Sequence, residues 1–177
     1  MLTESIDRAL AAAGRIRRHH ALEHATMHIL SRRPRDVTFY ARASPRGLVV
    51  YGDLPTEDVV SAVTEALARL RNGEYQLAVH PNCGTNLVTA GTLTGLAALI
   101  VTTVPGMGKK RTSPWHLLSS LPLAILAATL ALLVAQPLGQ ALQANVTTDA
   151  EMKNLVLKHI TRHQQGPLVY HTVRTVG

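Results

Sequence analysis

Two long uncharged runs limit what this chain can fold into more than any other feature of its sequence. Residues 87–104 are 18 positions without a charged side chain, and residues 115–135 form a second run without Asp, Glu, Lys or Arg. A helix of about 20 apolar residues matches the hydrocarbon thickness of a bilayer. The chain has 177 residues, which leaves too little other structure to bury two such helices in a soluble core. We therefore predict a hairpin of two transmembrane helices, about 87–104 and 115–135.

The overall composition favours a membrane and argues against nucleic acid. The formal charge is +7, although 46% of the residues are hydrophobic and only 3% are aromatic. A basic chain with long apolar runs suits an anionic lipid surface, whereas scarce aromatic rings leave few platforms on which bases could stack. The single cysteine excludes an intrachain disulfide framework. We expect the lipid bilayer as a partner and no nucleic acid.

Two signals for the orientation of the hairpin disagree. Lys109, Lys110 and Arg111 lie in the short connection, and basic residues favour the cytoplasmic side. However, residues 1–13 lack the basic start and apolar core of a signal peptide, so translocation of the Arg-rich N-terminal segment would be difficult. We favour both termini in the cytoplasm, and the basic connection counts against this orientation.

The N-terminal sequence predicts a small soluble α+β domain, because apolar residues recur at helical spacing in two segments, alternate over residues 36–43 and form two further short runs bounded by turn residues. The expected order is helix 3–33, strands 36–43 and 48–51, helix 56–72 and strand 75–79. Thr56 is predicted to cap the second helix. We assign residues 1–85 to this α-β-β-α-β domain and residues 86–137 to the two transmembrane helices.

The C-terminal segment, residues 138–177, is compatible with two structures. Apolar spacing over residues 152–160 fits a helix, whereas residues 155–161 and 168–175 fit a β-hairpin equally well. We favour the hairpin, with its last strand returning to the N-terminal sheet and the segment packing on the soluble domain.

The strongest chemical pattern is His20-Ala21-Leu22-Glu23-His24. On a helix, residues three and four apart share a face, so both imidazoles and the carboxylate point the same way. This His-x-x-Glu-His order is typical of inverted zincins, in which two His bind metal and the Glu acts on a water molecule. The alternative is an exposed, His-rich helix face on a basic protein.

A second cluster follows in His80-Pro81-Asn82-Cys83-Gly84-Thr85-Asn86. His80 and Cys83 have the spacing of a metal knuckle, and Cys83 precedes a helix for which Thr85 or Asn86 is the expected cap. A helix N-terminus stabilises a thiolate, which favours Cys83 as a ligand or a nucleophile. The alternative is a small buried thiol in a tight loop.

Other residues remain open candidates. His28 continues the four-residue spacing from His24, and His171 could reach the site if the last strand joins the sheet. Gly91 and Gly95 form a Gly-x-x-x-Gly pair on the first transmembrane helix, which is a face for close packing and for a homo-oligomer.

The two motifs, followed by an apolar run, resemble the YqhQ-like family of bacterial membrane proteins, which are described as metal-dependent enzymes of unknown activity. The similarity covers about a fifth of the chain. The resemblance implies a metal site at His20, Glu23, His24, His80 and Cys83 and a location in the bacterial plasma (inner) membrane. It does not imply a reaction.

Two functions are compatible with these residues. The first is a zinc-dependent hydrolase, or one that uses another divalent metal, with His20, His24, His80 and Cys83 as candidate ligands and Glu23 as the base. Its substrate would be a membrane protein, a peptide or a lipid-linked molecule. The second is a membrane scaffold or assembly factor with a closed structural zinc site. A weaker third possibility is Cys83 as a nucleophile.

Overall fold

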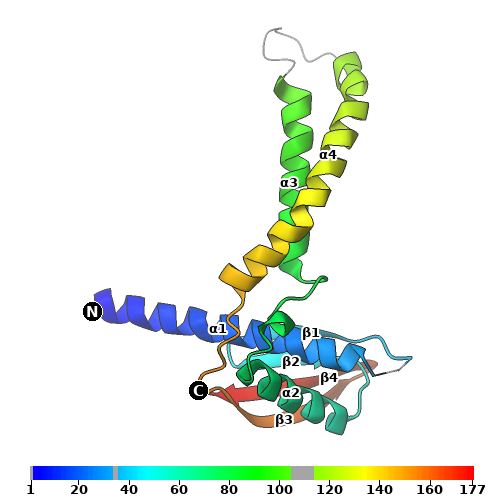
Figure 1. Cartoon of the computed structure of the whole chain (residues 1–177). Helices are drawn as coiled ribbons and strands as arrows, with labels where there is room; N and C mark the ends of the chain where they lie inside the picture. The colour runs from blue at the N-terminus through cyan, green and yellow to red at the C-terminus, as the bar shows by residue number, and fades with distance from the viewer. Residues whose placement is uncertain (1, 34–35, 105–113) are drawn as a thin grey trace. The chain divides into compact units, whose positions relative to one another are not determined.

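The computed structural model describes residues 2–33, 36–104 and 114–177. Its contacts divide the chain into two units. The first unit contains Met1–His80 and Gln143–Gly177, and the second contains Pro81–Leu142. The described residues include four α-helices and a four-stranded antiparallel sheet, so the predicted α+β class is confirmed (Figure 1).

The first unit is built around a helix and the first hairpin. α1 (Leu2–Ser31) matches the predicted helix 3–33. β1 (Tyr40–Ser44) and β2 (Gly47–Tyr51) pair antiparallel, as predicted, although β1 begins later than the alternation suggested. α1 and α2 (Thr56–Arg71) cover one face of the sheet (Figure 1). Together they bury a continuous apolar core.

The C-terminal segment completes this sheet. β3 (Val156–Gln165) and β4 (Leu168–Val176) form a hairpin, and β4 pairs antiparallel with β2 to give the strand order β1-β2-β4-β3. The prediction of a returning β-hairpin is therefore confirmed, and the alternative helix over residues 152–160 is wrong. Val173 on β4 and Val50 on β2 are both buried, which explains why the last strand joins the sheet.

Two local predictions are wrong. Thr56 is the first residue of α2 and not its N-cap: Pro55, whose side chain cannot accept a hydrogen bond, occupies that position, and the Thr56 hydroxyl lies 3.2 Å from His171 Nε2. Residues 75–79 are not a strand: Tyr75–Ala78 form a short 3₁₀ helix, η1. Leu77 and Ala78 are adjacent and both buried, which a helical turn allows and the alternating faces of a strand do not.

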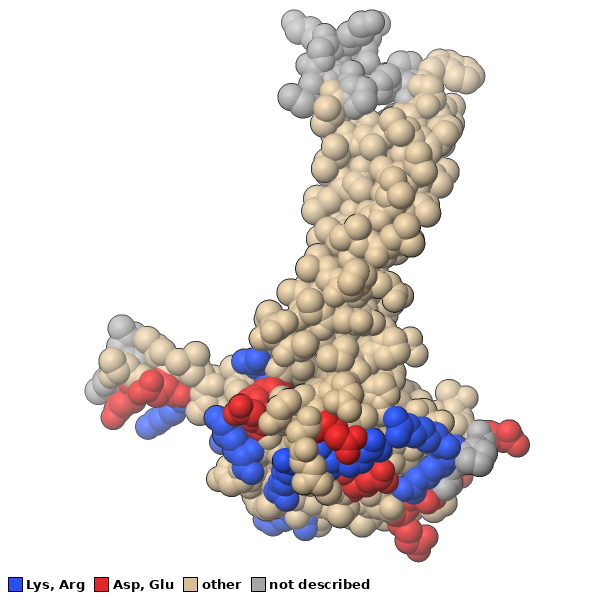
Figure 2. Space-filling view, in the orientation of Figure 1, with Lys and Arg blue, Asp and Glu red and all other residues tan. Residues whose placement is uncertain are grey.

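The second unit is a pair of apolar helices, α3 (Gly84–Thr103) and α4 (Pro114–Leu142). Both are longer than the predicted spans, since helix continues beyond the central apolar stretch. By length and composition, residues 84–103 and 118–147 can cross a membrane. In the 18-residue apolar stretch of each segment, only 6% and 11% of the residues are buried. The visible face of these helices carries no Lys, Arg, Asp or Glu among its described residues (Figure 2). Lys109, Lys110 and Arg111 lie outside the described residues.

We expect Gly139→Ala to destabilise the second unit. A methyl group at Gly139 would lie 3.1 Å from Asn86 Cα and would also contact Asn86 Oδ1. The helices would have to separate, at a cost of about 1–3 kcal/mol. Unfolding of the full chain in detergent, followed by circular dichroism, measures this loss. Gly91→Ala is the matched control, because its added methyl group has no neighbour within 4 Å; equal losses in both variants would contradict the prediction.

We also expect His171 to make stability depend on pH. His171 is fully buried on β4, and burial, followed by repulsion from Arg162, lowers its pKa below 6.5. The unfolded chain therefore binds a proton at a higher pH than the folded chain does, and the free energy of unfolding falls as the pH drops below 6.5. His171→Gln should flatten this decrease in a series of urea titrations. An unchanged slope would show that His171 does not contribute.

Candidate metal centre

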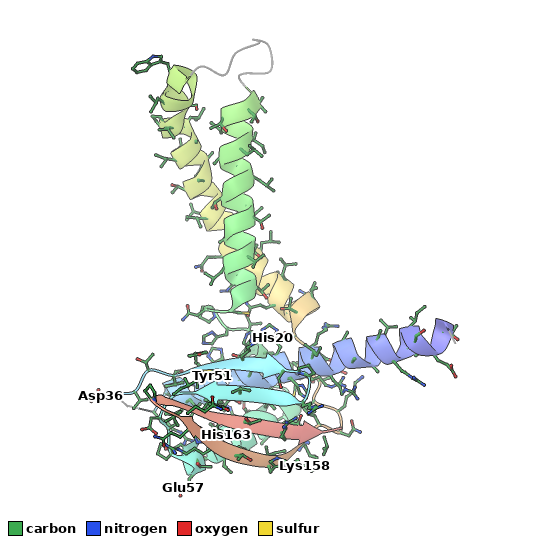
Figure 3. All side chains as sticks on the ribbon, turned by 180° about the vertical axis from the view of Figure 1, so that it is seen from behind. His20, Asp36, Tyr51, Glu57, Lys158 and His163 are labelled. Carbon is green, nitrogen blue, oxygen red and sulfur yellow. The ribbon has the colours of Figure 1, made fainter. Side chains whose placement is uncertain are left out.

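Five ionisable side chains of the first unit gather beside the C-terminal half of α1. His20, Glu23, His24 and His28 lie on successive turns of the helix, and His80 follows η1. Figure 3 shows His20 at the side of the sheet where α1 runs. The ring centroids of His20 and His24 are 4.4 Å apart, those of His24 and His80 are 5.8 Å apart, and those of His28 and His80 are 4.8 Å apart. Tertiary structure therefore brings His80 to the helical motif.

Backbone carbonyl groups determine which nitrogen of each imidazole holds the proton. His24 Nδ1 lies 2.7 Å from the Ala78 carbonyl oxygen, and His20 Nδ1 lies 3.0 Å from that of Thr147. A carbonyl only accepts, so both Nδ1 atoms are the donors, and in the neutral ring the Nε2 atom carries the lone pair that a metal needs. A histidine whose other nitrogen donates in this way is typical of metal ligands.

Glu23 lies between these two lone pairs. Its Oε2 atom is 3.9 Å from His20 Nε2 and 3.9 Å from His24 Nε2. Two ligand atoms of a tetrahedral zinc site are about 3.4 Å apart, given metal–ligand distances of about 2.1 Å. The carboxylate oxygen is therefore about half an ångström farther than a neighbouring ligand position. This geometry suits a group that contacts a ligand of the ion or that binds the ion after a small movement.

The surroundings of His80 lower its pKa. Burial, followed by repulsion from His28 and His24, lowers the pKa of His80 to about 4. The imidazole is therefore neutral at pH 7 and does not need to lose a proton before it can coordinate a metal.

The cluster lies where the chain leaves and re-enters the first unit. The backbone N–H of His80 donates to Gln143 Oε1 at 2.9 Å, and Gln143 is fully buried. α4 ends at Leu142, and a π-helical turn, η3 (Gln143–Thr147), follows it. Because His20 contacts Thr147 in this turn, both ends of the inserted apolar segment are anchored beside the histidines.

Cys83 begins the second unit's first helix. It is the N-cap of α3, and its Sγ atom accepts from the Thr85 backbone N–H at 3.5 Å. The predicted caps Thr85 and Asn86 instead lie inside the helix. Since Cys83 follows His80 by three residues, covalent geometry keeps their Cα atoms within about 11 Å. Within the first unit, His20 and His24 are a pair of donors that could hold a metal ion of unknown identity.

The histidine cluster differs from the sequence-based expectation at His28, at two backbone carbonyl groups and at His171. His28 belongs to the cluster through His80, and its four-residue spacing from His24 was the available signal. The carbonyl oxygens of Ala78 and Thr147 leave no side-chain pattern in the sequence and could not be predicted. His171 instead lies beside Thr56, whose hydroxyl oxygen is 3.2 Å from its Nε2 atom, and its neighbour on β2 is Val50.

Comparison with known proteins finds an uncharacterised family. A family model described as a domain of unknown function, DUF6391, matches residues 15–160. An uncharacterized protein of Picosynechococcus sp. is 31% identical over 163 residues, which cover 82% of this chain and 71% of that protein. No solved structure matches the chain. An uncharacterised family was expected, whereas these comparisons give no support to the YqhQ-like resemblance.

We expect Gln143→Leu to destabilise the first unit. The change removes the side-chain oxygen of the fully buried Gln143, which accepts a partly buried hydrogen bond from the His80 backbone N–H. Loss of the acceptor for a buried donor costs about 1–3 kcal/mol. Urea unfolding of the full chain in detergent measures the difference. The matched control is Gln140→Leu, because Gln140 is exposed on α4; a similar loss in the control would contradict a special role for Gln143.

Proposed function

The chain belongs to the DUF6391 family, and we propose that it is a membrane-anchored, metal-dependent hydrolase. The observation that carries this proposal is the arrangement of three side chains on α1. His20 Nε2 and His24 Nε2 each lie 3.9 Å from the same carboxylate oxygen of Glu23. Two imidazoles beside one carboxylate are sufficient to bind a divalent ion next to a general base.

The donors favour zinc. Imidazole nitrogen and thiolate sulfur suit Zn²⁺ better than the oxygen-preferring Mg²⁺ or Ca²⁺. His20 and His24 supply two ligands, and His80 or Cys83 supplies the third. A bound ion provides the Lewis acidity that cleavage of an amide or ester bond requires. Glu23 accepts a proton from the attacking water and transfers it to the leaving group when the scissile bond breaks.

The inserted helices support a site at the membrane surface. α3 begins at Gly84, four residues after His80, and α4 ends at Leu142, next to Gln143. If these helices span a bilayer, covalent geometry alone places the histidine cluster within about 15 Å of the interface. This location suits a membrane protein, a peptide at the surface or a lipid-linked molecule as substrate. We favour the plasma membrane with both termini in the cytoplasm.

A scaffold with a structural zinc site is the second candidate. The feature that favours it is the set of donor types: His20, His24, His80 and Cys83 are three imidazoles and a thiol, which are the ligands of closed structural zinc sites without a position for water. Cys83 is also the cap of α3, so a metal ligand there would fix the start of the first apolar helix to the first unit. Homo-oligomer formation through Gly91 and Gly95 stays a prediction.

Metal binding by the full chain in detergent tests the proposal. We expect one zinc ion per chain and, after substitution by Co²⁺, a visible spectrum of tetrahedral coordination. His24→Ala should weaken Co²⁺ binding by more than about 100-fold, since it removes a ligand rather than only its support. His159→Ala is the matched control, because His159 is exposed on β3. Equal affinity for wild type and His24→Ala would overturn the metal site.

Glu23→Gln separates the two candidates. In a hydrolase, the amide retains the metal and the fold but cannot accept the proton, so cleavage of ester or peptide substrates in vesicles is lost. In a scaffold, Glu23→Gln has little effect, whereas Cys83→Ala releases the metal and lowers the stability of the chain. X-ray absorption distinguishes the same candidates independently, because a light-atom ligand besides the protein's nitrogen and sulfur atoms indicates an open position.

A further inference from the structure

The N-terminal half of α1 carries an apolar stripe that the described structure leaves uncovered. Figure 1 shows this half of the helix extending past the sheet. Ile6 is 51% exposed, Leu10 is 65% exposed and Ala13 is also exposed. Spacings of four and three residues place these side chains on one face of the helix. A contiguous exposed apolar surface is typical of a site that contacts another protein or a membrane.

The same face points toward the residues that follow α4. Spacings of four and three continue from Ala13 to Arg17 and then to His20. The Arg17 guanidinium donates to the carbonyl oxygens of Asn145 and Thr148, at 3.2 and 3.0 Å. His20 contacts Thr147 in the same segment. Because α4 ends at Leu142, three residues of chain connect this face to the end of an apolar helix, a distance of at most about 11 Å.

The opposite face of this half-helix is charged. Glu4, Asp7, Arg8 and Arg15 are all exposed. Residues 3–18 contain four arginines and two carboxylates, so this segment has a net positive charge. An apolar stripe, a charged opposite face and a net positive charge are the properties of a helix that lies in the interface of an anionic bilayer.

We propose that residues 3–18 of α1 are a membrane-surface helix that inserts Ile6, Leu10 and Ala13 into an anionic lipid bilayer. This inference rests on the proposed membrane location, but it does not depend on metal binding or on hydrolysis. The stripe then continues directly into the metal cluster, since positions 20 and 24 follow it on the same face of α1. A substrate embedded in the bilayer surface would therefore meet His20 and His24 at the level where the stripe is inserted.

Tryptophan quenching by lipids tests the proposal. The full chain is reconstituted in vesicles of phosphatidylcholine and phosphatidylglycerol, and Trp115→Phe removes the single native tryptophan. Three variants are then compared: Leu10→Trp on the stripe, Arg8→Trp on the opposite face and Ile125→Trp in the middle of α4. The quenchers are lipids with a nitroxide near the headgroup or deep in the acyl chain, and aqueous iodide.

We expect the shallow nitroxide to quench Leu10→Trp at least about threefold more than Arg8→Trp, and iodide to show the reverse order. Equal quenching of the two positions would overturn the proposal. Protection of Leu10→Trp from both iodide and lipid would also overturn it, because a second protein surface would then cover the stripe. Ile125→Trp distinguishes a failure of the surface-helix proposal from a failure of the membrane location on which it rests. If the deep nitroxide does not quench Ile125→Trp, the membrane location itself is wrong.

Discussion

The hydrogen bond between the His80 backbone and the Gln143 side chain joins the two positions at which the inserted apolar helices interrupt the first unit. Residues 80 and 143 are 63 positions apart in the chain, yet Gln143 is fully buried against His80. The backbone carbonyl oxygen of Gln143 also accepts hydrogen bonds from the backbone N–H and the hydroxyl of Thr148. The polar groups of a buried amide need hydrogen-bond partners. Gln143 therefore holds the chain in place both where it leaves the first unit, at His80, and where it returns, at Thr148. The histidine cluster is assembled around these two positions.

The first unit requires both parts of the interrupted sequence. β4 lies between β2 and β3 and supplies Val173 to the core, which also contains Leu22 of α1 and Leu48 of β2. Without residues 156–176 the sheet would be a two-stranded ribbon, which is marginally stable in water. The complete sheet therefore requires pairing of β2 with β4 of the C-terminal hairpin. Such non-local pairing is intrinsically slow to form.

α1 uses one sequence pattern in two environments. Its C-terminal half is packed against the sheet and α2, with Leu22 and Leu30 buried, whereas its N-terminal half exposes Ile6 and Leu10. A single helix thereby connects the core, the histidine cluster and the uncovered stripe. Because an α-helix keeps side chains in register along its length, a partner bound to the stripe has a rigid connection to His20 and His24.

The sequence by itself determined the features that depend on local geometry. Helical spacing groups His20, Glu23 and His24, and the uncharged runs define both apolar helices. Tertiary structure decided the remainder: whether residues 75–79 alternate or turn, where Thr56 bonds, and how His80 reaches the cluster. The carbonyls of Ala78 and Thr147 select the imidazole tautomers. Every residue carries a carbonyl, so only the folded backbone determines which ones face the histidines.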